Sequence, residues 1–314
     1  MEAADKDEAA EQMLRHSLEL DSTQREAIQH LIALRQRQCE WPVVLPSERV
    51  EERALIAGLS PLSAAALSDD PLLQLAVACR YNRLDVGDPA QLVAARRPVT
   101  AGSAPLRVGY LSSDLREHAV GYLMTEVLGL HDRGKIEVFA YYCGPESKDP
   151  LHQHFKNTAQ HFTSITSLDD TAAARRIADD GVQILVDLNG YTREARLKLV
   201  AQRPAPVIVN WLGFPGSMAS PYHHYLIADE FIVPESHELY IFGKSTAFTV
   251  LSTEPAPPRG RRAHADAKRG RSARGRDGLL LLQRRAQDPP VHVRSLACHP
   301  GARSEQCALV AGRQ

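Results

Sequence analysis

Hydrophobic positions in the first 38 residues recur three and four apart, which is the period of one face of an α-helix. The series runs from Met13 to Leu34 and is interrupted once, at Asp21-Ser22, where a helix can be capped. Residues 8–38 are therefore predicted to form two helices. One helical pair cannot bury both of its faces. The segment 1–38 is thus either the remnant of a helical-repeat array or a hairpin that packs on the next domain.

Shorter helical patterns follow after Pro42, which breaks the first series. Pro61 follows Ser60 and Pro71 follows Asp70. Proline at the first turn of a helix loses no hydrogen bond, because an N–H at that position has no helical partner. The segment 39–103 is thus predicted to be a helical linker, with helices over 47–58, 61–67 and 71–83 and a loop over 96–105.

From Leu106 the pattern changes to short apolar runs separated by helical stretches. This alternation is typical of an α/β fold, in which helices cover both faces of a parallel sheet, and here it spans 104–240. The expected strands are 106–111, 136–142, 182–188, 207–212 and 225–228, and the expected helices are 118–130, 149–160, 171–180 and 193–201. Such sheets bind ligands at the carboxyl ends of their strands. The candidate ligand loops are therefore 112–118, 189–192 and 213–217.

Length and composition are those of a globular protein, with 314 residues and 44% hydrophobic content. The acidic start does not resemble a secretory signal, and no apolar run approaches the ~20 residues that a membrane helix needs. The five cysteines are odd in number and lack metal-site spacing. We expect a cytoplasmic protein with reduced thiols, no metal site and no membrane partner.

The net charge of −1 conceals two regions of opposite charge. Residues 241–314 carry 14 Lys and Arg against 5 Asp and Glu, whereas the rest of the chain carries 23 against 33. A basic tail of this kind is often a nucleic-acid-binding segment. We do not expect nucleic acid as a partner here, because the only aromatic residues of the tail are Phe242 and Phe248 and no recognition motif accompanies them.

His118 lies just past the first expected strand, at the start of the next helix. A histidine at this place could accept or donate a proton near neutral pH, and the N–H groups of the helix start could bind a polar ligand. A lone histidine at a helix start is also consistent with a surface or capping residue. His161, near another strand start, is ambiguous in the same way.

Two further loops carry candidate ligand-binding residues. In the first, Gly190 would let a ligand approach the backbone, and Asn189 and Thr192 could bind sugar hydroxyls; the alternative is a tight turn with Thr192 as a helix cap. The second loop, Leu212-Gly213-Phe214-Pro215-Gly216, should be rigid and expose backbone N–H groups to a ligand, or else be a strained β-turn. The sequence motifs typical of nucleotide hydrolases, dinucleotide-binding enzymes, zinc proteases and α/β-hydrolases are absent from the sequence.

Five segments together resemble the protein O-linked N-acetylglucosamine transferase family, including its bacterial and SPINDLY-like members. In chain order they read RVGYLSSDLREHAVGYLM, FKNTAQHF, DGVQILVDLNGYTREAR, RPAPVIVNWLGFPGSM and YLIADEFIVPE. Upstream, LRQRQCEWPVV resembles the segment that joins the tetratricopeptide repeats of the family to its catalytic region. The resemblance extends from about residue 31 to residue 240.

The resemblance implies the first lobe of a two-lobed B-type glycosyltransferase with a Rossmann-like sheet in each lobe. Such an enzyme transfers N-acetylglucosamine from uridine-diphosphate N-acetylglucosamine to Ser or Thr of a protein acceptor, with inversion and without a metal or other cofactor. By this similarity His118 matches the catalytic histidine and His161 a second histidine of the site. Leu212, Gly213 and Pro215, followed by Gly216, match the loop that touches the sugar.

Two departures from the family pattern bear on activity. The bacterial pattern reads His-Asp-Tyr before the last strand, whereas this chain has His223-His224-Tyr225, so His224 could remove a structural hydrogen bond. The repeat array is nearly absent, which argues against extended recognition of protein acceptors. A non-catalytic protein-binding or scaffold module is therefore the alternative function.

After Tyr240 the sequence no longer resembles the family, and residues 241–314 are interpreted as a frameshifted translation. Synonymous codons for 242–250, regrouped one base later, encode Ser-Glu-Lys-Val-Leu-Arg-Leu-Pro, the text expected in the family. The same shift at 280–289 yields Cys-Cys-Phe-Asn-Ala-Ala-His-Lys-Ile, which resembles the second-lobe motif whose lysine stabilises the departing diphosphate. We therefore expect a truncated enzyme with a disordered tail over 241–314 and little transferase activity.

Overall fold

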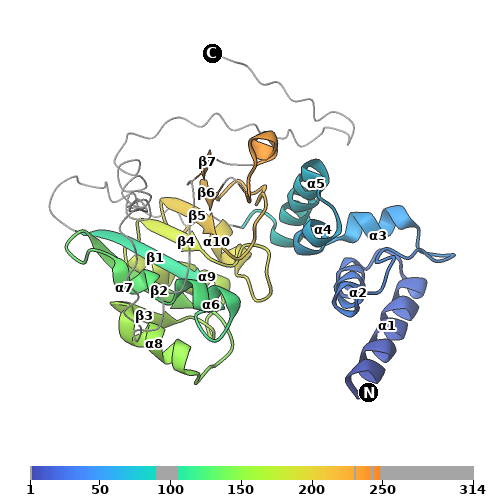
Figure 1. The fold of residues 1–314 in the computed structure, drawn as a ribbon, viewed down its shortest axis with the longest axis horizontal. Coiled ribbons are helices and arrows are strands. Elements are labelled where there is room, and N and C mark those ends of the chain that lie inside the picture. Colours follow the sequence, from blue (N-terminus) through green and yellow to red (C-terminus); the bar gives the residue numbers. More distant parts are fainter. Residues whose placement is uncertain (1, 90–104, 230, 242–243, 248–314) are drawn as a thin grey trace, which may run out of the picture.

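The computed structural model of the chain describes residues 2–89, 105–229, 231–241 and 244–247. They form an all-helical N-terminal segment and an α/β region, which lie side by side in Figure 1. Most of the expected loop 96–105, and the part of the expected tail from 248 to 314, lie outside the described residues. No helix in the described part of the chain is long and apolar enough to cross a membrane.

The N-terminal segment has its own hydrophobic core, which includes Leu18, Ile32 and Leu55. Its elements are α1 (Glu2–Leu20), α2 (Arg25–Gln38), α3 (Glu52–Gly58), α4 (Pro61–Leu67), α5 (Pro71–Tyr81) and a π-helical turn η1 (Asn82–Val86). The side chains of Ser60 and Asp70 cap α4 and α5, and the proline after each lies in the first helical turn, as predicted. The segment is thus a folded body that contains the predicted helical pair and the three helices predicted after Pro42, the first of which begins later than expected, at Glu52.

The break between α1 and α2 differs in detail from the prediction. Neither Asp21 nor Ser22 is the N-cap of α2; that position belongs to Gln24, whose side chain makes no cap hydrogen bond. Asp21 instead accepts hydrogen bonds from the N–H and hydroxyl of Thr23, at 2.9 and 2.6 Å. A short carboxylate binds the nearest free donors, which here are two residues away in the turn.

The α/β region contains a seven-stranded sheet in which every neighbouring pair of strands is parallel. In chain order the strands are β1 (Leu106–Ser112), β2 (Ile136–Tyr142), β3 (His161–Ser164), β4 (Ile184–Asp187), β5 (Val207–Trp211), β6 (Tyr225–Ala228) and β7 (Lys244–Ala247). Their order in the sheet is β3-β2-β1-β4-β5-β6-β7. The direction of winding reverses between β1 and β4, which is the place where doubly wound sheets bind ligands. The predicted Rossmann-like fold is confirmed.

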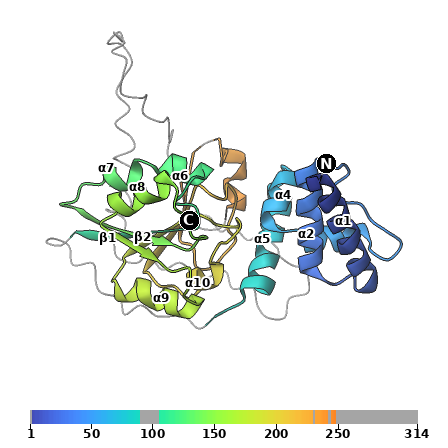
Figure 2. The same ribbon diagram turned by 90° about the horizontal axis from the view of Figure 1, so that it is seen from below.

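Helices cover both faces of this sheet, as Figure 2 shows. One face carries α6 (Ala119–Met124), α7 (Val127–Leu130) and α8 (Pro150–Thr158), and the other carries α9 (Asp170–Asp179) and α10 (Leu197–Ala201). Alternate residues of one strand enter different cores: Tyr110 packs on the side of α6–α8 and Leu111 on the side of α9 and α10. A strand with two covered faces needs a continuous apolar run, which is why β1 and β4 were recognisable in the sequence.

The predicted helix 118–130 is two helices. The hydroxyl of Thr125 donates to the carbonyls of Gly121 and Tyr122, at 3.1 and 2.8 Å, at the point where α6 ends. Side-chain hydrogen bonds of this kind compete with continued helix formation. The predicted helix 193–201 starts late, at Leu197, because Glu194 has a left-handed backbone with φ of 64°.

The predicted disorder from residue 241 is wrong at its beginning. Lys244–Ala247 form β7, which pairs in parallel with β6 from Tyr225 to Ala228. It follows a short 3-10 helix, η2 (Glu235–Tyr240). Strand pairing uses backbone groups, so an edge strand can form without the side-chain pattern that a sequence reading looks for.

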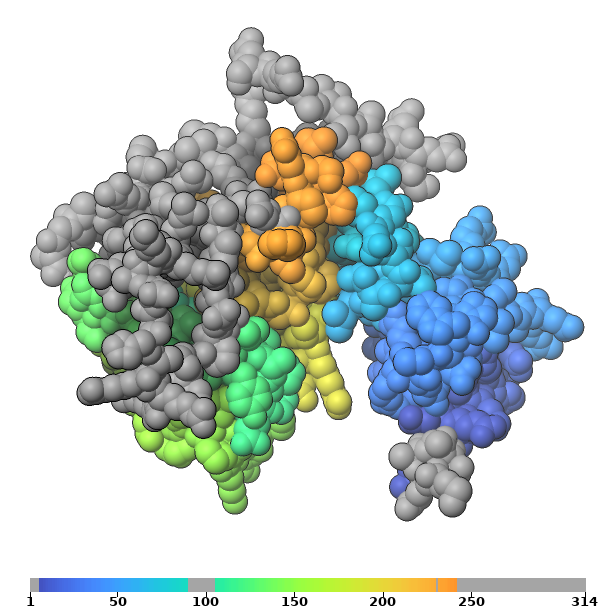
Figure 3. All heavy atoms as spheres, in the orientation of Figure 1, coloured from blue at the N-terminus to red at the C-terminus, as the bar shows by residue number. Residues whose placement is uncertain are grey.

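The helical segment meets the α/β region through its last two elements. Figure 3 shows the atoms of α5 against those of η2, and the two elements are in contact. An ion pair joins Arg25 of α2 to Asp85 of η1 across 2.8 Å. The turn η1 is therefore held on one side by α2 and on the other by its contact with α10 of the α/β region.

Candidate active site

The candidate ligand loops after β1 and β4 meet at the point where the winding of the sheet reverses. The backbone N–H of Ser113 donates to Oδ1 of Asn189 at 2.8 Å, and Nδ2 of Asn189 lies 2.8 Å from Oγ of Ser113. The two loops are thus held together by a pair of hydrogen bonds through one amide. The predicted convergence of these strand ends is confirmed.

Asn189 is the centre of this cluster and does not face solvent. Its residue is 1% exposed, and Nδ2 also donates to Oδ2 of Asp114 at 3.0 Å and to Oγ1 of Thr192 at 2.9 Å. The amide hydrogens are therefore occupied inside the protein, so the expectation that Asn189 binds sugar hydroxyls does not hold for this conformation. Asn189 positions the residues around it. Thr192 is half-buried and is not a helix cap, since Arg196 precedes α10.

A buried carboxylate below the cluster shapes the turn after β4. Asp187, the last residue of β4, accepts from the N–H groups of Asn189 at 3.0 Å and Gly190 at 3.2 Å. Its other side meets Nε2 of His223 at 3.2 Å, and Nδ1 of His223 lies 2.6 Å from Oγ of Ser220. The Ser220 residue is only 1% exposed, so this row of side chains supports the turn and offers no accessible nucleophile.

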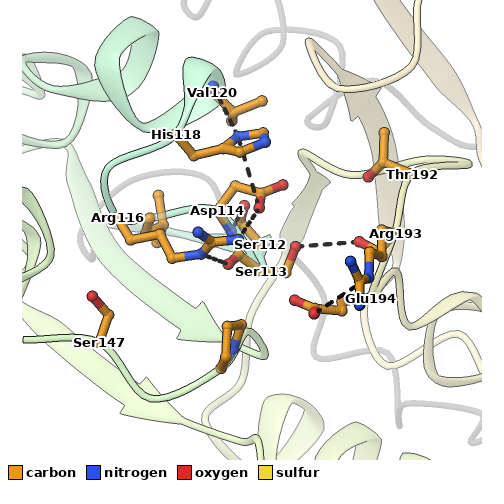
Figure 4. A network of polar contacts seen from close by, with 12 residues as sticks. Ser112, Ser113, Asp114, Arg116, His118, Val120, Ser147, Thr192, Arg193 and Glu194 are labelled. Atoms are coloured by element: carbon orange, nitrogen blue, oxygen red, sulfur yellow. Dashed lines mark hydrogen bonds and ion pairs between the residues drawn. The ribbon is translucent and has the colours of Figure 1, made fainter. Parts of the chain in front are cut away.

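His118 stands above the cluster, as Figure 4 shows, and its side chain is 42% exposed. Its Nδ1 accepts from the N–H of Val120 at 3.3 Å, which caps α6, and lies 3.7 Å from Oδ1 of Asp114. The same carboxylate oxygen is 3.4 Å from Nη2 of Arg116. The imidazole is thus held on one side by the protein and open to solvent on the other. This geometry lets Nε2 exchange a proton with a ligand.

The loop after β5 lies against the same cluster because one of its residues is glycine. A Cβ on Gly213 would be 2.2 Å from the carbonyl oxygen of Leu188 and 2.8 Å from that of Asn189. The N–H of Gly213 donates to Leu188 at 3.1 Å, so the predicted free N–H is wrong at this position. Close approach of two backbones satisfies the donor internally.

The other residues of this loop differ in exposure. Leu212 has a left-handed backbone with φ of 71°, which supports the alternative of a strained turn. Pro215 is exposed, whereas Gly216 is buried and a Cβ there would be 2.9 Å from the ring of Phe214. Pro215 and the half-buried Leu212 and Gly213 are therefore the positions of this loop that a ligand can reach.

Comparisons with known proteins identify the family of the chain. A family model described as glycosyl transferase family 41 matches residues 82–248, more than half of the chain. The chain belongs to glycosyl transferase family 41.

Named relatives are similar over the same part of the chain. A probable UDP-N-acetylglucosamine–peptide N-acetylglucosaminyltransferase SEC of Arabidopsis thaliana is 34% identical over 192 residues, which are 58% of this chain and 19% of the relative. The UDP-N-acetylglucosamine–peptide N-acetylglucosaminyltransferase of Caenorhabditis elegans is 38% identical over 130 residues, 41% of this chain and 11% of the relative. The chain thus spans less than a fifth of the length of these relatives.

A solved structure is similar in fold. A mutant of the Thermobaculum terrenum O-GlcNAc transferase superposes with a TM-score of 0.59 at 24% sequence identity. The match covers 76% of this chain and 46% of that one. At 24% sequence identity, this similarity shows only that the family 41 chain has the same fold.

His161 of this family 41 chain is not beside His118. It pairs with Phe139 in the middle of β2, three residues before that strand ends. Its imidazole stacks on Phe139 at 4.2 Å between ring centroids, and Nε2 lies 2.8 Å from Oε1 of Glu137. Partial burial raises the pKa of Glu137, but hydrogen bonds from His161 and Arg107 outweigh it and leave that pKa lowered. The structure does not bring His161 to the cluster, because it starts its strand and the cluster lies where strands end.

His224, the departure from the bacterial family pattern, keeps a hydrogen bond where a loss was expected. Its Nδ1 accepts from the N–H of Ile208 at 3.0 Å. Burial lowers the pKa of His224 to about 4, with Arg203 and His223 adding to the effect. A neutral imidazole can accept as a carboxylate does, so the expected loss of a structural bond is wrong.

Sequence reasoning missed the buried supports of this site. Asp187 ends an otherwise apolar strand, and a charged residue at such a place was an available signal. Asp114 was seen only as part of a loop, although it contacts His118 and Asn189. Among the described residues, no group of three His, Cys, Asp or Glu side chains could hold a metal ion.

Proposed function

We propose that this chain contributes to a transferase that moves N-acetylglucosamine from its uridine-diphosphate donor to Ser or Thr of a protein acceptor. Family membership supports the proposal, as do relatives whose names describe this peptide transfer. The observation that carries it is the accessible imidazole of His118, held over the reversal point of the sheet by Asp114. A ligand bound at that point would have its reacting atoms within reach of Nε2.

The residues would divide the work as follows. His118 would orient the acceptor hydroxyl or accept its proton. Leu212 and Pro215 would pack on the sugar, and Gly213 would allow their loop to lie close to Asn189. The reaction would need neither a metal nor another cofactor, because the leaving diphosphate would be stabilised by donors and positive charges of the protein.

We also propose that the protein works in the cytoplasm, which agrees with the free thiols of Cys39 and Cys143.

Calorimetric titration of the purified chain tests the donor assignment. We expect heat from UDP-N-acetylglucosamine and UDP, and none from ADP-glucose at the same concentrations. Equal responses to all three, or none to any, would refute the donor site and favour the non-catalytic scaffold.

Turnover is tested separately, with radiolabelled donor and a Ser/Thr-rich peptide. His118→Ala should abolish whatever transfer is seen, whereas the exposed neighbour Glu117→Ala should leave it unchanged. Equal transfer by wild type and His118→Ala would remove His118 from the reaction.

A further inference from the structure

Asn82, the first residue of η1, reaches from the helical segment into the α/β region. Its Nδ2 donates to the carbonyl of Met218 at 2.8 Å and approaches that of Ala219 at 3.2 Å. The residue is 7% exposed, so these bonds form away from solvent. One side chain of the helical segment thus fixes the backbone at the far end of the loop that begins with Gly213.

Two tyrosine hydroxyls also contact Asn82, and the carbonyl of Ala78 lies 3.1 Å from its Nδ2. The hydroxyl of Tyr222 donates to Oδ1 of Asn82 at 2.5 Å. Nδ2 of Asn82 donates to the hydroxyl of Tyr191, which in turn donates to the carbonyl of Met218 at 2.5 Å. Burial raises the pKa of both tyrosines, so both hydroxyls keep the proton that they donate.

Tyr191 connects this amide to both loops beside His118. It stands between Gly190 and Thr192, in the loop that Asn189 and Asp187 organise. The edge of its ring meets the ring of Phe214, in the Gly213 loop, at 5.0 Å between centroids. On the other side it meets Tyr81, the last residue of α5, at 5.3 Å.

The hydrogen bonds of Asn82 indicate that its side chain positions the neighbouring loops and does more than fill space. An amide is the side chain that offers two donors and an acceptor without charge, and Asn82 uses both kinds. An apolar residue would leave the Tyr222 hydroxyl without the acceptor that it has here, at about 1–3 kcal/mol for a buried group, whereas the Met218 carbonyl would keep its bond from Tyr191. Hydrogen bonds are directional, so they fix where the loops lie, whereas apolar contact tolerates sliding.

We propose that Asn82 is a positioning residue that sets the relative placement of loops 189–192 and 212–219, through which the helical segment controls sugar-nucleotide affinity. The control of sugar-nucleotide affinity rests on the proposed function. The placement of the loops stands on the hydrogen bonds themselves.

The experiment compares Asn82→Asp, which keeps the acceptor and loses the donors, with the wild-type chain. The matched control is Arg83→Ala, an exposed change in the same turn. Amide hydrogen exchange should quicken about tenfold in loops 189–192 and 212–219 of Asn82→Asp, which corresponds to about 1.4 kcal/mol, and stay unchanged in α8 and α9. The donor affinity should fall by a similar factor, while Arg83→Ala matches wild type in both measurements.

A milder variant covers the case in which Asn82→Asp does not fold. Tyr222→Phe removes one hydroxyl and keeps the ring, and it should loosen the same loops by a smaller factor. Unchanged exchange in both loops, or a uniform increase over the whole α/β region, would overturn the proposal. So would a wild-type affinity for UDP-N-acetylglucosamine in a variant whose loops have loosened. Loosened loops in a protein that binds no donor even as wild type would instead refute the proposed function and leave the positioning role intact.

Discussion

Nδ1 of His118 lies 3.7 Å from the carboxylate of Asp114 while it accepts a hydrogen bond from the N–H of Val120. These two contacts favour opposite states of the ring. The bond from Val120 needs a lone pair on Nδ1, which places the proton of the neutral ring on Nε2. The nearby carboxylate favours a proton on Nδ1, which leaves Nε2 free to act as a base. If His118 acts as a base, its Nδ1–H must point to Asp114, and the hydrogen bond from the N–H of Val120 that caps α6 is lost.

Asp114→Asn is expected to reduce transfer without unfolding the protein. Asparagine has the same shape but lacks the charge that would favour a proton on Nδ1 of His118. General acid–base catalysis contributes typically 10²–10⁴-fold, and we expect the rate constant of transfer to fall about 10²-fold with little change in KM. Steady-state kinetics measures both constants.

The control for Asp114→Asn is Glu117→Gln, an exposed carboxylate three residues away. It should keep wild-type kinetics. If Asp114→Asn also keeps the wild-type rate constant, Asp114 has no influence on the chemistry of His118.

The sequence predicted where the strands end and which loops meet there, because buried parallel strands have a strong apolar signal. It could not predict what each side chain does within those loops. Asn189 and Gly213 were predicted to face a ligand, but the N–H groups of both donate hydrogen bonds to neighbouring loops. Which donors are free depends on packing between segments distant in the chain, and a single sequence does not encode that locally.

Local signals failed for two further residues. Asn82 belongs to a predicted helix, and nothing in its neighbourhood indicates that it bonds Met218, 136 positions later. His161 was assigned by resemblance, whereas its observed partners are Glu137 and Phe139 on the adjacent strand. Resemblance transfers a residue type more reliably than it transfers its contacts.

Gly213→Ala is expected to destabilise the α/β region. The added Cβ would meet two backbone carbonyl oxygens at 2.2 and 2.8 Å, and backbone atoms cannot swing away as a flexible side chain can. Overpacking of this kind costs typically 1–3 kcal/mol. Urea unfolding should therefore give a free energy of unfolding that is lowered by that amount, together with a weaker response to UDP-N-acetylglucosamine.

Gly134→Ala is the matched control for Gly213→Ala. Its Cβ would meet only the side chain of Asp132, at 3.3 Å. Its free energy of unfolding should lie within about 0.5 kcal/mol of wild type, as for most surface changes. Equal stability of the two variants would mean that the Leu188 and Gly213 backbones are not in close contact.

The reading frame after Tyr240 is open to a direct test. The family model matches as far as residue 248, and Lys244–Ala247 pair with β6, so the change in character falls near the last strand of the sheet. Sequencing of the gene is expected to recover second-lobe codons one base out of frame beyond codon 241. A continuous frame through codon 241, with no second-lobe sequence in any frame, would rule out the frameshift.

Two partly buried histidines predict a loss of stability in mild acid. Burial lowers the pKa of His131 and of His224 to about 4, with nearby arginines adding to the effect. An unfolded histidine has a pKa of about 6.5, so between pH 6.5 and 4 the unfolded chain binds more protons than the folded one. The free energy of unfolding should therefore fall as the pH drops through this window, by at most about 3 kcal/mol per histidine, and these two residues cause no further loss below pH 4.

His224→Asn separates this effect from that of the carboxylates. An asparagine oxygen can accept the bond from Ile208 without titrating, so the variant should lose less stability than wild type between pH 6.5 and 4.5. The lowered pKa values of Glu137 and Asp149 act in a more acidic range, because a carboxylate releases its stabilisation only as the pH falls through its own pKa. His16→Gln, at an exposed position of α1, should follow the wild-type curve. The free energy of unfolding of wild type and His224→Asn is measured with urea at pH 7.0, 5.5 and 4.5. The same difference between the two proteins at all three pH values would show that His224 is not held neutral by burial.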